Sequence, residues 1–437
     1  MEMLEGLEKI CEVYRAESYA YDETPIPVRP KAADFVVVKP RNSSEVSEIL
    51  KFANERRIPV FVRGGGTGLS GGSIPTRKGI MISTERMKEI VIDRKNRVAF
   101  CQAGVTLEEL SRSAERHGLS FPPRPGAESA TIGGMIATNA GGVRALKFGV
   151  MRNYVLGLEA VLADGRILKL GGKTLKNSSG YSLLHLLIGS EGTLAVITGA
   201  NIRLLPPLKD MAMLAIPFRN AEDAISFALD TFLRMTPMAM EFMEDRAVRI
   251  GEEVSGTRWV SKEGNAHILA IFERSEEAEE ASEIAFRYGA IDVFLPSPRE
   301  QIKLLELRGK IYIGLKDRII EILDACVPPA QIPEYLKSSE KLAERYGIDM
   351  ITYGHLGDGN IHQHPLLFEG WKRVYPRFRR ELLRLVVNLG GVISGEHGIG
   401  VLKREELREF YPEQYRIMFE IKKLFDPNMI LNPDRIF

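Results

Sequence analysis

The chain has 437 residues, of which 44% are hydrophobic and 27% charged, and its formal net charge at pH 7 is +1. This length is enough for two or three domains, and the balanced charge excludes the strongly basic surface that nucleic-acid binding requires. No segment reaches the roughly 20 apolar residues of a membrane-spanning helix, and the first twenty residues lack the apolar core of a signal peptide. We therefore expect a cytoplasmic protein, with docking at the inner face of the membrane as an alternative.

The three cysteines, Cys11, Cys101 and Cys326, are far apart in the sequence and form no Cys-x-x-C pair. The chain therefore predicts neither a disulfide framework nor an iron–sulfur cluster of its own. A cluster that receives electrons from this protein would belong to another chain.

The first half of the chain predicts alternating strands and helices. Phe35–Lys39 and Ile58–Arg63 are apolar runs typical of buried strands. The second run leads directly into the glycine-rich segment Arg63–Gly72. Two further segments of small residues follow at Pro122–Gly142 and Gly189–Thr198. Such loops expose backbone N–H groups, which suit an anionic ligand such as a phosphate.

After Pro206-Pro207 the pattern changes to two strand–helix–strand units. Two such units predict a split βαβ, ferredoxin-like sheet with helices on one face. Trp371–Leu389 and Glu405–Phe425 predict two further helices. The six elements of the sheet units are expected at Met213–Phe218, Ala221–Arg234, Met238–Met243, His267–Glu273, Glu276–Arg287 and Ile291–Leu295.

Four of the seven histidines lie between His355 and His397. Strand-like residues flank the turn Gly357–Asn360, so a hairpin is expected to bring His355 and His362 together. With Glu396 next to His397, these side chains form the imidazole and carboxylate set that suits a divalent transition metal. Histidines of such a hairpin are also often ordinary core or surface residues, and the spacing alone does not decide between the two.

The loop Arg63–Gly72 matches no phosphate-binding pattern in full. It lacks the Lys-Ser/Thr ending of a nucleotide-triphosphatase loop and the distant acidic residue of a Rossmann site. A glycine-rich surface turn is the alternative. Arg63 could pair with a phosphate, and a pyrophosphate between this loop and Pro122–Gly142 would meet several N–H groups.

These three small-residue segments resemble the FAD domain of the vanillyl-alcohol oxidase flavoprotein family, from about residue 30 to residue 207. The resemblance implies bound FAD. Some relatives attach the flavin to a histidine of the first loop, where this chain has Gly66-Thr67, so the FAD is expected to be non-covalent. The residues that the resemblance places at the cofactor are Arg63, Gly64, Gly65, Gly66, Thr67, Gly68, Gly126, Thr131, Gly133, Gly134, Thr138, Asn139, Glu191, Gly192 and Ile197.

Residues 208–437, with Tyr353–His364 and Ser394–Gly400, resemble the C-terminal domain of the FAD-linked D-2-hydroxyacid dehydrogenases. This group includes D-lactate dehydrogenases, the catalytic flavin subunit of glycolate oxidase and D-2-hydroxyglutarate dehydrogenase. The resemblance implies oxidation of a small 2-hydroxy acid, with hydride transfer to flavin N5. The expected roles are metal ligation by His355, His362 and Glu396, proton abstraction by His397 and carboxylate binding by Arg308.

Several alternatives stay open at this point. The metal is expected to be zinc, and manganese and iron are compatible with the same ligands. Arg308 could also be a solvent-exposed helix residue. Some relatives have a second carboxylate-binding lysine before the Val-Pro-Pro turn, and Glu321–Pro328 has none, which favours D-lactate or glycolate over a dicarboxylate.

The expected fold class is α+β, with an FAD-binding domain of the vanillyl-alcohol oxidase type at residues 1–207. A ferredoxin-like antiparallel cap domain with the metal site is expected at 208–400, and a segment returning to the FAD domain at 401–437. The electron acceptor could be a quinone, a cytochrome or an iron–sulfur partner, and a homodimer is compatible with the sequence. Alternative functions are an electron-transfer or assembly subunit without chemistry of its own and an ether-lipid synthase, although the latter has a run of histidines where this chain has Gly395–Gly398.

Overall fold

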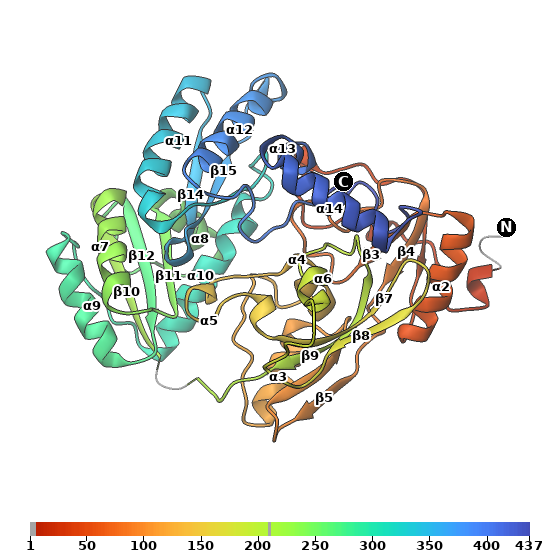
Figure 1. Ribbon diagram of the computed structural model, residues 1–437. Helices are drawn as coiled ribbons and strands as arrows, with labels where there is room; N and C mark the ends of the chain where they lie inside the picture. Colours follow the sequence, from red (N-terminus) through yellow and green to blue (C-terminus); the bar gives the residue numbers. More distant parts are fainter. Residues whose placement is uncertain (1–5, 209–210) are drawn as a thin grey trace.

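The computed structural model describes residues 6–208 and 211–437, and these residues form three β-sheets (Figure 1). Two sheets lie in the N-terminal region, residues 6–208, and the third lies in the C-terminal region, residues 211–437. The chain therefore changes from one kind of architecture to another near Pro206-Pro207, as the sequence indicates.

The first sheet has the strand order β1-β2-β4-β3, in which β2, β4 and β3 are parallel and β1 is antiparallel to β2. Helix α2 (Ser43–Arg56) connects β2 to β3, and it begins where the Asn42 side chain accepts a hydrogen bond from the backbone N–H of Glu45. The strands are β1 (Val13–Tyr14), β2 (Phe35–Val38), β3 (Val60–Arg63) and β4 (Gly79–Ser83).

The second sheet is antiparallel, with the order β5-β6-β9-β7-β8. Short helices lie against it in one core that contains, among others, Leu110, Ile136 and Leu187. Its strands are β5 (Ile90–Asp93), β6 (Val98–Gln102), β7 (Val155–Val161), β8 (Ile167–Gly171) and β9 (Val196–Arg203). The helices are α3 (Leu107–Arg116), α4 (Ile132–Thr138), α5 (Ala145–Phe148) and α6 (Leu183–Leu187).

The third sheet is antiparallel and has the order β10-β12-β11-β14-β15-β13. Its strands are β10 (Ala212–Phe218), β11 (Ala239–Glu244), β12 (Ala266–Phe272), β13 (Leu323–Cys326), β14 (Met350–His355) and β15 (Asn360–Pro365). The helices of this region are α7 (Ala221–Arg234), α8 (Asp245–Ser255), α9 (Ser275–Arg287), α10 (Pro298–Leu315), α11 (Ile332–Tyr346), α12 (Trp371–Asn388), α13 (Arg404–Phe410) and α14 (Pro412–Phe425).

The ferredoxin-like arrangement is confirmed, but the strand expected at Ile291–Leu295 is wrong. This segment makes only isolated bridges to β10, at Ala215–Phe294 and Phe218–Ala290. Pro217 of β10 accepts a hydrogen bond from the N–H of Ile291 but has no N–H to return, so the ladder is interrupted. The hairpin β14–β15 extends the opposite edge of the sheet, beyond β11.

The expectation of helices on one face only is also wrong. Side chains alternate along β10, so that Leu214 and Ile216 face a core with α7, α9, α11 and α12. Met213 and Ala215 face a second core with α8 and α10. The sheet is therefore buried on both faces, and α10 lies on the face that also carries part of the functional site.

The single helix expected at Glu405–Phe425 is in fact two helices, α13 and α14. The break falls at Tyr411-Pro412, because proline has no N–H for the helical ladder and disfavours helical backbone in the residue before it. After α14, the chain returns to the first sheet, where Leu431 bridges Val60.

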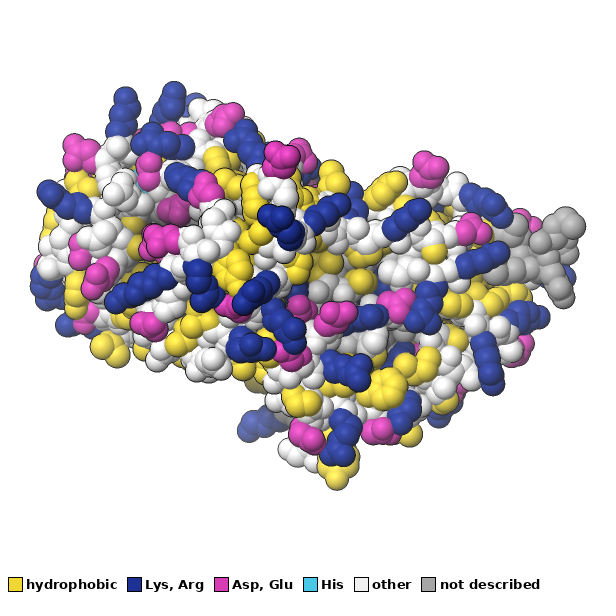
Figure 2. Space-filling model, turned by 90° about the horizontal axis from the view of Figure 1, so that it is seen from above, with side chains coloured by type: hydrophobic (Ala, Val, Ile, Leu, Met, Phe, Trp, Pro, Cys, Tyr) yellow, Lys and Arg dark blue, Asp and Glu magenta, His cyan; other side chains and the backbone are white. Residues whose placement is uncertain are grey.

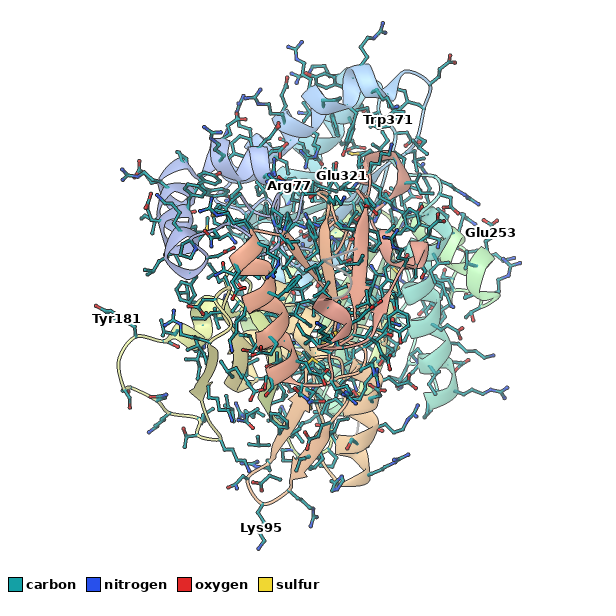
Figure 3. All side chains as sticks on the ribbon, turned by 90° about the vertical axis from the view of Figure 1, so that its right-hand side faces the viewer. Arg77, Lys95, Tyr181, Glu253, Glu321 and Trp371 are labelled. Carbon is teal, nitrogen blue, oxygen red and sulfur yellow. The ribbon has the colours of Figure 1, made fainter. Side chains whose placement is uncertain are left out.

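Figures 2 and 3 show two features on the outside of the molecule. Figure 2 shows hydrophobic side chains gathered near the middle of the upper face. In α13, α14 and the C-terminal segment, Phe410, Tyr415 and Phe437 are partly buried in one cluster. At the outer edge, Tyr181 is 99% exposed and its loop extends into solvent (Figure 3). The functional site lies on the inner side, between the two regions.

Candidate functional site

A cavity of about 590 Å³ lies between the N-terminal and C-terminal regions. Its N-terminal side, here called the glycine wall, includes Gly64, Gly65, Gly66, Gly133 and Gly134. Its C-terminal side, here called the histidine wall, is formed by His355, His362, Glu396, His397 and Arg308. All the residues expected to bind metal or substrate therefore line one cavity.

The glycine wall is formed by two loops that pack closely against each other. A Cβ atom on Gly64 would lie 2.2 Å from Thr131 Oγ1, and one on Gly65 would lie 2.4 Å from the backbone oxygen of Ser129. Gly66 has a φ of +69°, which is unfavourable for residues with a side chain. These positions need glycine because the backbone itself forms the wall.

The cavity has room for a cofactor along this wall. A Cβ atom on Gly126, which lines the cavity, would meet no atom within 4 Å. Thirteen of the expected cofactor residues line the cavity, namely Gly64, Gly65, Gly66, Thr67, Gly68, Gly126, Thr131, Gly133, Gly134, Thr138, Glu191, Gly192 and Ile197. The residues present therefore fit a large ligand that is bound mainly through backbone groups.

Two residues of the expected cofactor set lie elsewhere. Arg63 donates a hydrogen bond to the backbone oxygen of Tyr21 and lines a second cavity of about 380 Å³ behind Gly64 and Gly65. The Asn139 side chain accepts a hydrogen bond from the N–H of Arg152. Neither residue lines the main cavity.

The histidine hairpin forms as the sequence indicates. In the β14–β15 register, Tyr353 lies opposite His362 and His355 lies opposite Asn360. His355 and His362 therefore project from the same face, and their ring centroids are 5.3 Å apart. Gly359 makes the turn possible, with a φ of +81°.

His355, His362 and Glu396 bring three potential metal-binding atoms together. Oε1 of Glu396 lies 3.5 Å from His355 Nε2 and 3.4 Å from His362 Nε2, and all three atoms lie within 4.8 Å of one another. Burial favours the neutral form of Glu396, but the two imidazoles hold its pKa well below the usual range. This donor set fits a divalent transition cation and leaves room for substrate oxygens.

Glu241 is a buried carboxylate that sequence reasoning missed. It lies directly opposite His355 in the β11–β14 register, and its Oε1 is 2.6 Å from His355 Nδ1. Its Oε2 accepts a hydrogen bond of 2.6 Å from Arg308 Nε. A single acidic residue within the apolar run Ala239–Met243 was the signal that could have identified it.

Glu241 orients Arg308 and leaves part of its guanidinium available. Nη2 of Arg308 is buried and has no hydrogen-bond partner among the described residues. A buried donor of this kind is unfavourable unless a ligand accepts from it. Arg308 is therefore suited to bind a carboxylate that enters the cavity.

His397 completes the histidine wall. Its ring stacks on that of His362, with centroids 5.2 Å apart and an interplanar angle of 9°. Burial lowers the pKa of His397 below its usual value although Asp324 raises it, which favours the neutral ring that can accept a proton. His364 is different, because it is buried, stacks on Tyr353 and does not line the cavity.

Two protein-family comparisons match separate parts of the chain. The family described as FAD binding domain matches residues 35–171, and the family described as FAD linked oxidases, C-terminal domain, matches residues 208–436. The first match agrees with the glycine wall, and the second includes the histidine wall. FAD as the cofactor, expected from the sequence, is thereby confirmed.

Several relatives match over almost their whole length. D-lactate dehydrogenase of Archaeoglobus fulgidus is 64% identical, with 100% of this chain and 99% of the relative covered. D-lactate dehydrogenase of Anaerostipes hadrus is 39% identical (96% and 92% covered), and glycolate oxidase subunit GlcD of Bacillus subtilis is 34% identical (96% and 92% covered).

Solved structures of low sequence identity share the fold. p-Cresol methylhydroxylase with substrate bound gives a TM-score of 0.79 at 16% identity, covering 100% of this chain and 96% of that chain. Alkyldihydroxyacetonephosphate synthase gives 0.76 at 16% identity, covering 99% and 86%. The expected fold class is thereby confirmed.

No helix in residues 6–208 and 211–437 is both long and apolar enough to cross a membrane.

The two family matches and the 64% identical relative together cover the chain from one end to the other. The chain belongs to the family of FAD-linked oxidases.

Proposed function

We propose that this protein oxidises a small D-2-hydroxy acid to the corresponding 2-oxo acid, with D-lactate as the first candidate substrate and glycolate as the second. The observation that carries the proposal is the convergence of Arg308, His397 and the cluster of His355, His362 and Glu396 on the cavity that the glycine wall lines. The relatives named D-lactate dehydrogenase, at 64% and 39% identity, support the choice of substrate.

Arg308 binds the substrate carboxylate in this proposal. Its buried Nη2 provides a free donor, while its Nε remains on Glu241. Guanidinium groups bind carboxylates with defined geometry, so this contact also sets the orientation of the adjacent α-carbon. Tyr353, whose ring centroid is 5.1 Å from Cζ of Arg308, lines the same cavity.

His355, His362 and Glu396 would hold one divalent metal ion, with zinc as the first choice and manganese and iron as alternatives. When bound, the ion would act as a Lewis acid that lowers the pKa of the substrate hydroxyl. Glu241 accepts from His355 Nδ1, which directs Nε2 toward the cavity. The same carboxylate therefore orients a metal ligand and the carboxylate-binding arginine.

His397 is the proposed base, assisted by its neutral state in the folded protein. Its Nδ1 lies 3.7 Å from Asp324. Its Nε2 lies 3.8 Å from Glu396 and therefore faces the proposed metal ligands. Nε2 would take the hydroxyl proton as the Cα–H bond breaks and the hydroxyl carbon becomes a carbonyl. FAD, when bound, supplies the acceptor for the Cα hydrogen together with its bonding electron pair.

Electrons must then leave the protein, and a quinone, a cytochrome or an iron–sulfur partner would serve as the acceptor. Each would give the same first half-reaction, because reduction of the FAD precedes the second transfer. The first test therefore monitors only the flavin, in the absence of oxygen and of any other acceptor.

The test mixes the purified protein anaerobically with D- and L-lactate, glycolate and D-2-hydroxyglutarate and follows the visible flavin absorbance. We expect bleaching by D-lactate, loss of bleaching after treatment with a chelator, and recovery with zinc, manganese or iron. Lys316, which is exposed and lines the cavity, is the side chain that a dicarboxylate would use, so the panel includes 2-hydroxyglutarate. A colourless protein, or bleaching by the L-isomer alone, would contradict the proposal.

A further inference from the structure

The loop Ser394–Gly400 carries both Glu396 and His397, and it belongs to no helix or strand. Gly398 and Gly400 have φ values of +79° and +54°, which give the loop a tight path. Within the loop, Ser394 Oγ lies 2.8 Å from the backbone oxygen of Gly398. The contacts that fix it come from both regions of the protein.

Asp324 of β13 holds the loop from the C-terminal region. This carboxylate is completely buried, and its Oδ2 accepts hydrogen bonds from the backbone N–H groups of Glu396 (3.1 Å) and His397 (2.8 Å). Ser394 Oγ lies 3.0 Å from the same oxygen and 2.8 Å from the backbone oxygen of Gly398, so its one proton is available to either acceptor. Its Oδ1 accepts from Asn360 Nδ2 at 2.8 Å, which ties the loop to the histidine hairpin.

Glu191 holds the same loop from the N-terminal region. Its Oε1 accepts from the N–H of Ile399 (2.7 Å) and its Oε2 from the N–H of Gly400 (2.8 Å). Its backbone has a φ of +51°, which is uncommon for a residue with a side chain. The neighbouring contact from Ser70 Oγ to the backbone oxygen of His397, at 2.9 Å, joins the loop to the Arg63–Gly72 segment as well.

We propose that Asp324 and Glu191 are positioning residues that place His397 and Glu396 relative to the bound flavin. Each carboxylate accepts hydrogen bonds from two consecutive N–H groups, on opposite sides of Gly398. Together the four hydrogen bonds fix the loop to both regions of the protein. The inference rests on the proposed catalytic role of the loop.

Arg308 and His397 would contact the substrate, whereas Asp324 and Glu191 would only position the loop. A displacement of about 1 Å in a catalytic group can lower a rate by about a hundredfold without weakening substrate binding to the same degree. Loss of Asp324 or Glu191 should therefore act mainly on the rate of flavin reduction. Substrate affinity, which Arg308 provides in the proposed mechanism, should change little.

The test variants are Asp324→Asn and Glu191→Gln, which keep the size of each side chain and replace one acceptor oxygen by an NH₂ group. Asp426→Asn is the matched control. Asp426 is also completely buried and accepts from two consecutive N–H groups, those of Ile430 (3.1 Å) and Leu431 (2.7 Å), but it holds the C-terminal segment instead of the loop.

The first measurement is backbone hydrogen exchange in the flavin-loaded protein without substrate, which depends neither on metal nor on turnover. We expect the amides of residues 396–400 to exchange about tenfold faster or more in Asp324→Asn and Glu191→Gln. Asp426→Asn should instead accelerate exchange at residues 428–432. Unchanged protection of residues 396–400 in both test variants would overturn the inference.

The second measurement is anaerobic reduction of the flavin over a range of D-lactate concentrations. We expect the limiting rate to fall by about ten- to a hundredfold in both test variants, with the half-saturating concentration within about threefold of the unmodified protein. A limiting rate equal to that of Asp426→Asn would overturn the positioning role. If Asp324→Asn does not retain flavin, Ser394→Ala, which removes a donor to the same oxygen, is measured in its place.

The two measurements separate this inference from the proposed function. If the unmodified protein is not bleached by any D-2-hydroxy acid, the proposed function fails. If it is bleached while the test variants keep both its rate and its loop protection, the positioning inference fails alone.

Discussion

The two walls of the cavity are built in opposite ways. The glycine wall is formed by backbone, and at Gly64 and Gly65 even one added carbon would collide with the neighbouring loop. The histidine wall is formed by polar side chains, and Glu241 behind it holds two of them, His355 and Arg308. The first wall should therefore be sensitive to added atoms and the second to the loss of single polar atoms.

The largest expected effect on the histidine wall comes from His397→Ala. Removal of a general base typically lowers a rate by about 10²–10⁴-fold, and we expect turnover with D-lactate to fall within this range. Flavin content should be unchanged, because the glycine wall is not altered. Steady-state turnover and the flavin absorbance of the purified variant check both parts. Turnover within threefold of the unmodified protein would instead favour an electron-transfer or assembly subunit.

Arg308→Lys should have the next largest effect. A lysine has one nitrogen, so it cannot keep Glu241 and also bind the substrate carboxylate as a guanidinium can. We expect the KM for D-lactate to rise by about a hundredfold, which corresponds to roughly 2.7 kcal/mol, and kcat to change much less. Initial rates over a wide range of D-lactate concentrations measure this.

Arg246→Lys is the control for the arginine replacement. Arg246 makes a two-point contact with Asp349, at 2.7 and 2.9 Å, but on the protein surface. Exposed ion pairs contribute little to the free energy of folding, so the Arg246→Lys variant should have the same KM for D-lactate as the unmodified protein. An equal rise in KM in both variants would show that Arg308 does not bind the substrate carboxylate.

On the glycine wall, Gly65→Ala tests sensitivity to an added atom. The new Cβ would lie 2.4 Å from the backbone oxygen of Ser129, so one loop must move. Overpacking of this kind costs about 2 kcal/mol, which corresponds to roughly thirtyfold weaker FAD binding. Titration of the flavin-free protein with FAD measures the change. Gly172→Ala is the control, because an added Cβ there would meet no atom within 4 Å, and this variant should bind FAD normally. Equal FAD affinities of the unmodified protein, Gly65→Ala and Gly172→Ala would show that the glycine wall is not sensitive to an added atom.

The sequence was sufficient to predict features that depend on local pattern. The glycine-rich loops, the turn at Gly357–Asn360 and the pairing of His355 with His362 all follow from short segments whose periodicity and turn residues are informative. The break between α13 and α14 was also present in the sequence, at Pro412, but the apolar periodicity on both sides concealed it.

Features that depend on strand register could not be predicted in this way. Glu241 and Asp324 become partners of the histidines only because β11 pairs with β14 and β13 pairs with β15, in registers that place them opposite His355 and His362. Sequence spacing contains no such information, since the paired residues are far apart in the chain. The second face of the sheet was missed for the same reason, because α8 and α10 reach it only through the strand order.

The smallest expected effect is on the free energy of unfolding, and it comes from Glu244, which lies three residues after Glu241 on the same strand. Oε1 of Glu244 is buried without a hydrogen-bond partner among the described residues, and burial raises the pKa of Glu244 to about 7 although Arg246 lowers it. A folded-state pKa above the unfolded value means that stability is fully present at low pH and is lost as the pH rises through 7. Glu244 thus lacks the pairing that keeps Glu241 ionised.

Glu244→Gln should therefore stabilise the protein at pH 8, where the native side chain must be buried as an anion. We expect a gain of about 1 kcal/mol in the free energy of unfolding at pH 8 and much less at pH 5, after allowance for partial solvent screening. Urea unfolding of both proteins at the two pH values measures the difference. Glu253→Gln, whose side chain projects into solvent (Figure 3), should change neither value. An equal shift at both pH values would show that loss of charge at Glu244 is not the cause, and that an unpaired carboxylate is tolerated on the strand that carries Glu241.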